Sequence, residues 1–116
     1  MAAAHRDQRW VFAGEIPAEE CGQGVRRQVM AYGEDAMCVV NHFETGGIGA
    51  MHSHPHTQIT YVASGAFRFT IGGEEKVVRA GDTLLKREGV PHGCVCLEQG
   101  ILVDFFTPMR EDFIKE

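Results

Sequence analysis

The sequence contains no Cys-x-x-C pair. Four of its 116 residues are Cys, and the missing spacing is the one that zinc ribbons and thioredoxin-type redox sites use. Cys94 and Cys96 lie two residues apart, so on a strand their side chains point the same way and are badly placed to bridge. We therefore expect small buried thiols in a reducing compartment rather than disulfides.

An excess of basic charge and long apolar runs are also missing. Asp and Glu number 16 against 11 Lys and Arg, a net charge of −5, whereas nucleic-acid binding requires a basic patch. The longest stretch without these residues, 45–67, contains three His, one Pro and four Gly, which excludes a membrane span. The first ten residues carry charges and lack the apolar run of a signal peptide. We expect a cytoplasmic chain that binds neither nucleic acid nor membrane.

Turn-forming residues divide the chain into short runs with strand chemistry. The 14 Gly and 4 Pro are spread evenly and form no linker, which favours one domain over residues 1–116. Phe67, Phe69 and Ile71 alternate with polar residues, as in a half-buried strand, and a hairpin turn at residues 72–73 follows them. The predicted strands are residues 37–43, 58–63, 66–71, 76–79, 83–86 and 101–106. Short strands at this spacing indicate an all-β sandwich or small barrel.

One helical signal stands near the C-terminal end. Thr107 can cap a helix, and Pro108 suits the first helical position. These two residues predict a short helix over residues 109–116. We therefore expect a single all-β domain that ends in a short C-terminal helix.

Histidines gather in the middle of the chain. His52, His54 and His56 lie within five residues, and on an extended chain residues two apart share a face. Gln58 has the same parity and can add an amide oxygen, and His92 would join from a separate strand. Three imidazoles and one carbonyl oxygen suit one divalent transition metal ion, and they do not select among Ni, Zn, Fe and Mn. The alternative is a surface cluster without metal.

The glycines around these histidines carry a family resemblance. Gly46 precedes His52 with five residues between, and Gly65 follows Gln58 after six more. This stretch, 46–65, resembles the first motif of the cupin family, with Gln58 where the family usually has Glu. The resemblance implies a jelly-roll barrel with a metal in its mouth.

A second stretch, residues 81–96, resembles the second cupin motif. It begins at Gly81 and continues through Gly89 to His92. Arg87 stands where the family usually has Pro, and Cys96 where it usually has Asn. The two motifs together indicate a single cupin jelly-roll barrel.

The amide at position 58 changes the charge of the expected site. With four neutral ligands a metal keeps its full +2 formal charge toward a substrate. Such a site attracts an anionic chelator and is a stronger Lewis acid than one holding a carboxylate. The alternative is that Gln58 is merely tolerated in a metal-free pocket.

Two charged residues near the end are further candidates. Asp104 interrupts the apolar run 101–106 and shares a face with Leu102 and Phe106. It is either an outward-facing charge or a carboxylate on the barrel wall that exchanges a proton beside the metal. Arg110 follows the strand, and its guanidinium either binds a substrate carboxylate or is a solvated surface group.

The chain as a whole resembles the KdgF type of cupin, small pectin-degradation proteins that linearise unsaturated monouronates. Residues 49–56, 92–98 and 104–113 carry this closer resemblance, and residues 24–28 add weaker support. It implies the metal ligands His52, His54, Gln58 and His92, and the active-site residues Asp104, Phe106 and Arg110.

The implied reaction converts 4,5-unsaturated monouronates from pectin or alginate to linear 5-keto-4-deoxyuronate, an isomerase- or lyase-type ring opening. Opening the hemiacetal releases the ring oxygen as an enolate conjugated to the carboxylate, and C4 is then protonated. Asp104 is the candidate acid and base, Arg110 the carboxylate clamp and Phe106 a packing wall. His56 is either a polar contact or a rim residue.

Two other functions are compatible with the same metal ligands. One is a non-catalytic cupin that binds a small acid or sugar, and the other is a metal-dependent dioxygenase that consumes oxygen. Cupins of this size usually pair, so we expect a homodimer in which N-terminal strands are exchanged.

Overall fold

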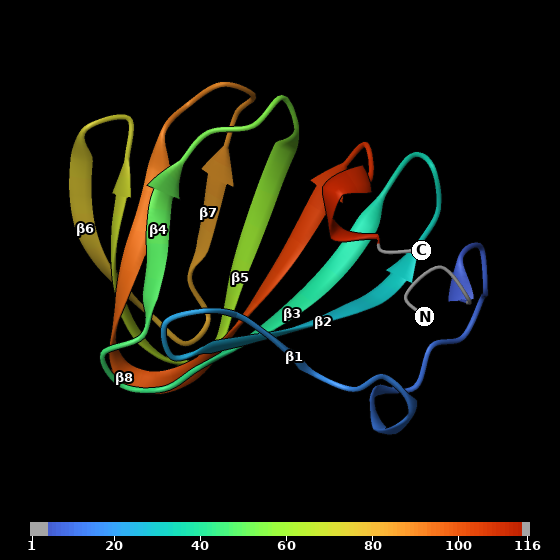
Figure 1. The fold of residues 1–116 in the computed structure, drawn as a ribbon. Coiled ribbons are helices and arrows are strands. Elements are labelled where there is room, and N and C mark those ends of the chain that lie inside the picture. The colour runs from blue at the N-terminus through green and yellow to red at the C-terminus, as the bar shows by residue number, and fades with distance from the viewer. Residues whose placement is uncertain (1–4, 115–116) are drawn as a thin grey trace.

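Two long bent strands organise the fold (Figure 1). The computed structural model describes residues 5–114. β5 (Thr57–Ile71) and β8 (His92–Thr107) pair antiparallel along their lengths, from Thr57 opposite Thr107 to Ile71 opposite His92. The pairing shifts register near the middle of both strands, between Val62 and Phe67 on β5. Such irregularities bend and twist a strand, so the two halves of each strand serve different parts of the barrel.

The other strands add to these two halves. The second half of β8 pairs with β3 (Met37–Phe43), which β2 (Val25–Tyr32) and β1 (Glu19–Gly22) extend. The first half of β8 pairs with β4 (Ile48–His52). β7 (Thr83–Lys86) pairs with the first half of β5 and β6 (Glu74–Arg79) with the second. The arrangement is all-β, as expected. Within residues 5–114 no helix is long and apolar enough to cross a membrane.

Two glycines make the bend possible. A Cβ on Gly65 would lie 2.5 Å from the Glu98 carbonyl oxygen and 2.7 Å from the Gly100 Cα. A Cβ on Gly100 would collide with the Ser64 carbonyl oxygen. Gly65 also has φ +83°, a conformation that side chains disfavour. The backbones of β5 and β8 therefore touch at this corner.

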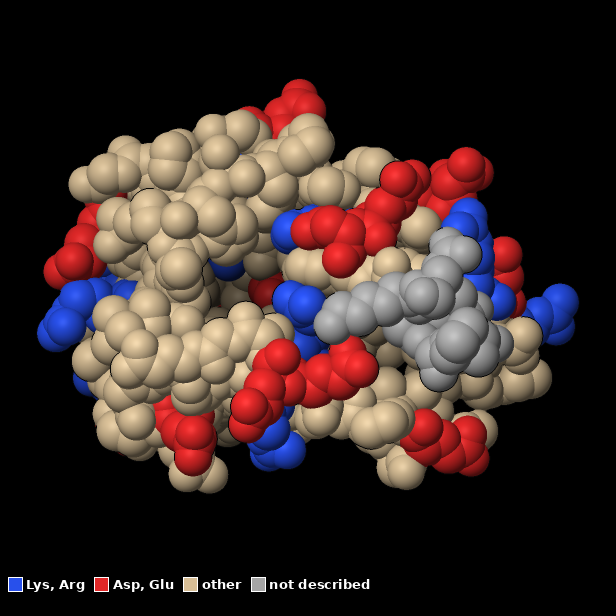
Figure 2. All heavy atoms as spheres, viewed as in Figure 1, with Lys and Arg blue, Asp and Glu red and all other residues tan. Residues whose placement is uncertain are grey.

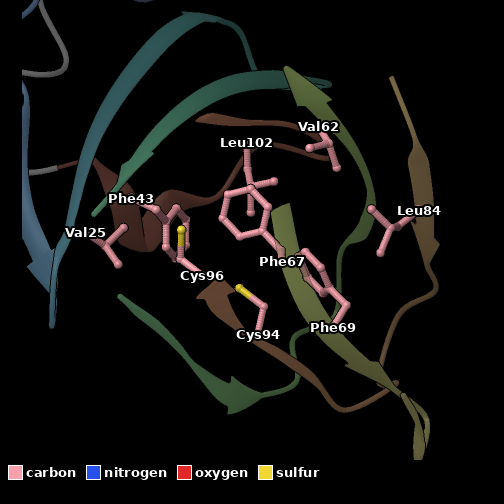
Figure 3. Packing of buried hydrophobic residues seen from close by; sticks show 9 residues of the cluster. All are labelled: Val25, Phe43, Val62, Phe67, Phe69, Leu84, Cys94, Cys96 and Leu102. Atoms are coloured by element: carbon pink, nitrogen blue, oxygen red, sulfur yellow. The ribbon is translucent and has the colours of Figure 1, made fainter. Parts of the chain in front are cut away.

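The apolar core fills the space between the strands (Figure 3). Side chains from five strands converge there, and Phe43 meets the fully buried Phe67 edge to face, with ring centroids 5.2 Å apart. The cluster consists of Val25, Phe43, Val62, Phe67, Phe69, Leu84, Cys94, Cys96 and Leu102. A second cluster, including Met37, Val39 and Phe106, extends the core toward the C-terminal segment.

The cysteines agree only partly with the expectation of buried thiols. All four are free, and Cys94 and Cys96 are buried with the same parity on β8. Burial raises the pKa of the Cys94 thiol to about 11, so it stays protonated and inert. Cys21, however, is exposed on the short strand β1, where no second layer covers it.

The C-terminal helix is the element that sequence reasoning got wrong. Only a single 3-10 turn, η3 (Glu111–Phe113), forms within the expected range 109–116, of which residues 115–116 lie outside the described part. Arg110 has an extended backbone, with φ −85° and ψ 97°, so no helix starts at Pro108. Met109 is buried in the second cluster and its amide donates to the Glu34 carbonyl at 3.1 Å. Packing therefore overrides the local helical signal.

The glycine corner predicts a specific instability. Gly100→Ala should lower the free energy of unfolding by about 3 kcal/mol, because the new methyl group meets backbone that cannot move without breaking the β5–β8 pairing. The urea midpoint measures this loss. Gly14→Ala is the control, since a Cβ there meets no heavy atom within 4 Å. Equal midpoints for the two variants would contradict this account of the bend.

Candidate metal centre

Three histidine rings meet where β4, β5 and β8 come together at one end of the barrel. His52 ends β4 and lies opposite His92, the first residue of β8, and their ring centroids are 4.5 Å apart. His54 lies in the connection to β5, where the Gly89 amide donates to its carbonyl at 2.8 Å. The candidate ligand nitrogens of the three rings all lie within 4.8 Å of one another. One residue of the trio is thus placed by a loop and not by strand alternation.

Gln58 brings an oxygen to the same place. It is the second residue of β5 and is buried, and its Oε1 lies 2.9 Å from Nε2 of His54. Two ligands at right angles around one ion, each about 2.1 Å from it, are separated by about 3.0 Å. The spacing of this pair therefore fits two neighbouring positions of a metal site.

The hydrogen bonds of two rings point their other nitrogens at the centre. Nδ1 of His52 lies 2.7 Å from the Ala50 carbonyl, and Nδ1 of His92 lies 3.0 Å from the Val90 carbonyl. A carbonyl only accepts, so Nδ1 carries the proton and Nε2 presents a lone pair. Nε2 of His92 is buried and has no hydrogen-bond partner among the described residues. An orphaned lone pair beside two other donors is what a divalent ion would satisfy, so the residues present fit a metal.

Burial also keeps the rings neutral, as metal ligands must be. It lowers the pKa of His92 to about 4, and the nearby Lys86 contributes further. The pKa of His54 is lowered mainly by burial as well. Both rings are therefore uncharged at neutral pH.

His52 and His92 lie on the wall of a cavity of about 450 Å³. Figure 2 shows a hollow near the middle of the viewed face, with basic and acidic atoms visible in its depth. Its walls include apolar Phe43, Phe69 and Leu102 and the charged groups of Lys86, Asp104 and Arg110. Small-molecule sites have this size and this mixture of apolar walls and a few polar groups.

Asp104 faces into this cavity and is buried. The Thr60 hydroxyl donates to its Oδ1 at 2.5 Å, and Nδ2 of Asn41 donates to its Oδ2 at 2.7 Å. The alternative of an outward-facing charge does not hold, because the inner face of β8 is the one that carries Leu102, Asp104 and Phe106. Both carboxylate oxygens are oriented by a donor.

Arg110 is likewise buried and not a solvated surface group. Its Nε and Nη2 donate to the Asp112 carboxylate at 3.0 and 2.7 Å, which lowers the pKa of that carboxyl. The guanidinium lies over the rings of Phe106 and Phe113, 5.1 and 4.2 Å from their centroids. One edge of the guanidinium is thus used by Asp112, and its outer edge, formed by the two terminal nitrogens, remains for an anion.

Phe106 forms the wall between the histidines and Arg110. Its ring packs edge to face on His54, at 5.6 Å between centroids, and on Phe113, at 5.7 Å. His56 packs on both His54 and Phe106, at 5.4 and 6.3 Å between ring centroids, and its Nδ1 is buried with no hydrogen-bond partner among the described residues. His56 is therefore inside the site's surroundings rather than on an open rim.

Sequence reasoning missed Asn41 and Lys86, which line the cavity, and Thr60, which donates to Asp104. Thr60 follows Gln58 by two residues on β5, and Lys86 lies directly opposite Gln58 on β7. Thr60 is fully buried and Lys86 is 3% exposed. Residues 58 and 60 lie two apart on one strand, so the sequence could have indicated that Thr60 shares a face with Gln58. The position of Lys86 depends on the β5–β7 register, which requires the structure.

Comparisons with known proteins agree with this geometry. The model of the cupin domain matches residues 39–106, and the chain belongs to the cupin family. Within that family it is a homologue of the pectin degradation protein KdgF of Dickeya dadantii (strain 3937). The two are 40% identical over 109 residues, which cover 92% of this chain and 99% of that protein. The resemblance to KdgF-type cupins is thereby confirmed.

Solved structures give the same result. An RmlC-like cupin from Shewanella frigidimarina NCIMB 400 superposes with a TM-score of 0.90 at 37% identity, covering 93% of this chain and 97% of that one. KdgF from Halomonas sp. has a TM-score of 0.86 at 32% identity, covering 90% of this chain and 97% of that one.

The metal site predicts a loss of affinity without a loss of fold. His52→Ala should weaken zinc binding by more than about 100-fold, because it removes one ligand, while the folded strands keep the others in place. Isothermal titration with zinc measures the affinity, and circular dichroism of the metal-free chain measures the fold. His42→Ala, outside the cluster, should bind zinc normally. Wild-type affinity in His52→Ala, or an unfolded metal-free chain, would contradict this assignment.

The buried histidine also predicts how stability depends on pH. An unfolded histidine titrates near pH 6.5, and His92 titrates at about 4 in the folded chain. Between these values the unfolded chain binds a proton that the folded chain does not, so stability falls as pH falls through this window. Urea midpoints in chelator should therefore drop more steeply between pH 6.5 and 4 for the wild type than for His92→Gln. Parallel curves would show that His92 does not contribute.

Proposed function

We propose that this chain opens the ring of 4,5-unsaturated monouronates and releases linear 5-keto-4-deoxyuronate. The observation that carries the proposal is one cavity lined by His52 and His92 of the histidine cluster, by the buried carboxylate of Asp104 and by Arg110. Its homology to a pectin degradation protein supports a substrate from this class. The net reaction is an isomerisation, in which a proton leaves one substrate atom and returns to another.

Arg110, Phe106 and Asp104 have separate roles in this reaction. Arg110 binds the substrate carboxylate through its outer edge, and Phe106 packs beside it. Asp104, whose oxygens already accept two hydrogen bonds, takes the proton of the C1 hydroxyl. The C1–O5 bond then breaks, C1 becomes an aldehyde and the ring oxygen becomes an enolate. Asp104 returns the proton to C4, which leaves a ketone at C5.

His52, His54, Gln58 and His92 would hold one divalent transition metal ion. When bound, the ion supplies Lewis-acid stabilisation of negative charge on the substrate oxygens. All four ligands are neutral, which leaves the charge of the ion to be balanced by an anionic substrate. His56 is a polar neighbour of this site.

We also propose an oligomeric state, a cellular location and a domain organisation. We infer that the chain forms a homodimer with exchanged N-terminal strands, that it is cytoplasmic, and that residues 1–116 are one cupin domain. Its partner molecule is a small anionic sugar rather than a nucleic acid or a membrane.

Turnover of unsaturated galacturonate tests the function. The absorbance of the conjugated double bond should disappear with the metal-loaded chain, and chelator should abolish this change.

Asp104→Asn should lower kcat by about 10²–10⁴-fold with little change in KM, since it cannot exchange a proton. Arg110→Ala should mainly raise KM, because the carboxylate is present in ground and transition states alike. Asp35→Asn, an exposed acid, is the control.

Other outcomes would point to the other functions. Tight binding of the uronate without turnover indicates a binding module, for which Asp104→Asn should leave affinity nearly intact. Consumption of oxygen with iron bound indicates a dioxygenase. Near-normal turnover by Asp104→Asn would refute the acid and base assignment.

A further inference from the structure

Lys86 is a buried lysine that the proposed reaction does not use. It is 3% exposed, lies on β7 opposite Gln58 and faces the same cavity as the histidines. Its Nζ lies over the Phe69 ring, 4.5 Å from the centroid, and donates to the Thr60 hydroxyl at 2.9 Å. Lysines are almost never fully buried unless they are paired, so a lysine in this place requires an explanation.

The hydrogen bonds of the Thr60 hydroxyl connect Lys86 to Asp104. A hydroxyl has one hydrogen to donate and two lone pairs that accept. Lys86 fills one lone pair of Thr60 Oγ1, and Nε2 of Gln58 approaches the same oxygen at 3.4 Å. The single hydrogen of the Thr60 hydroxyl is thereby left to donate to Oδ1 of Asp104.

The carboxylate of Asp104 is consequently held from both sides. Thr60 fixes Oδ1, and Asn41 on β3 fixes Oδ2. Thr60 and Asp104 are also Cα partners in the β5–β8 pairing, so the hydroxyl and the carboxylate are aligned by the backbone. A chain of donors thus runs from β7 through β5 to β8 and ends on the group that exchanges the proton.

We propose that Lys86 and Thr60 are positioning residues that set the orientation of the Asp104 carboxylate. Lys86 acts through Thr60 and does not contact the substrate. This inference rests on the proposed function for its kinetic consequence, whereas its structural part concerns Asp104 alone. A misplacement of a reacting group by about 1 Å can lower a rate about 100-fold, so a small rotation of the carboxylate is enough to matter.

Variants of Thr60 test the first link. Thr60→Val has nearly the same shape but cannot donate, and it should lower kcat for unsaturated galacturonate by about 10- to 100-fold. KM should not change, because Arg110, which binds the substrate carboxylate, has no contact with Thr60. Thr60→Ser keeps the hydroxyl and should restore most of the rate. Equal loss in Thr60→Val and Thr60→Ser would indicate packing and overturn the proposal.

A double-variant comparison tests the second link. Lys86→Met should lower kcat about 10-fold in the wild-type chain and should have no further effect in Thr60→Val, because the two residues act in series. Lys76→Met, on the exposed strand β6, is the control that removes a lysine elsewhere. A rise in KM for Lys86→Met, or effects that simply add, would show that Lys86 acts on the substrate directly.

Crystal structures separate failure of this proposal from failure of the function. If the wild type does not turn over uronates, the proposed function is wrong, and the orientation of Asp104 can still be compared in wild type, Thr60→Val and Lys86→Met. The carboxylate should be rotated away from its contact with Asn41 in the two variants and unchanged in Thr60→Ser. An unchanged carboxylate in all of them would overturn the positioning role.

Discussion

The antiparallel pairing of β5 with β8 is the constraint on which the barrel and the cavity both depend. At one end this pairing places Thr60 opposite Asp104 and Gln58 opposite Phe106, and at the other it carries Phe67 and Cys96 into the core. The close approach of the two backbones at Gly65 bends both strands between these regions. The site therefore draws on both ends of β8, since His92 begins the strand and Asp104 lies near its other end, with core residues between them.

Sequence patterns predicted the strands whose residues alternate clearly and the turns that contain glycine. They divided β5 into two strands at residues 64–65, because the pattern does not show that pairing with β8 continues through a register shift. They missed β1, β2 and the first half of β8, and also β4, which is largely exposed and lacks alternation. The C-terminal helix failed for a related reason, since burial of Met109 is a tertiary effect that local capping signals do not contain.

The sequence predicted those residues of the site whose type alone indicates their chemistry. Histidine spacing identified the cluster that His52, His54 and His92 form. Lysine and threonine carry no such signal, because on most strands Lys86 would be a solvated charge and Thr60 a surface hydroxyl. Their importance comes from the register of β7 against β5, which requires long-range pairing. Deriving the contacts of Asp104 therefore needs the fold, although Asp104 itself stood out in an apolar run.

The carbonyls that hold Nδ1 of His52 and His92 belong to the residues two positions earlier in the chain, Ala50 on β4 and Val90 just before β8. Each imidazole is thus aimed by its own short segment, and no distant side chain has to be correct for the lone pair to face the centre. The orientation of each of these two rings therefore does not depend on the side chains of the cavity wall. Such a cluster can keep its metal chemistry while the residues that select the substrate diverge. Chains with different substrates can therefore share this arrangement of ligands.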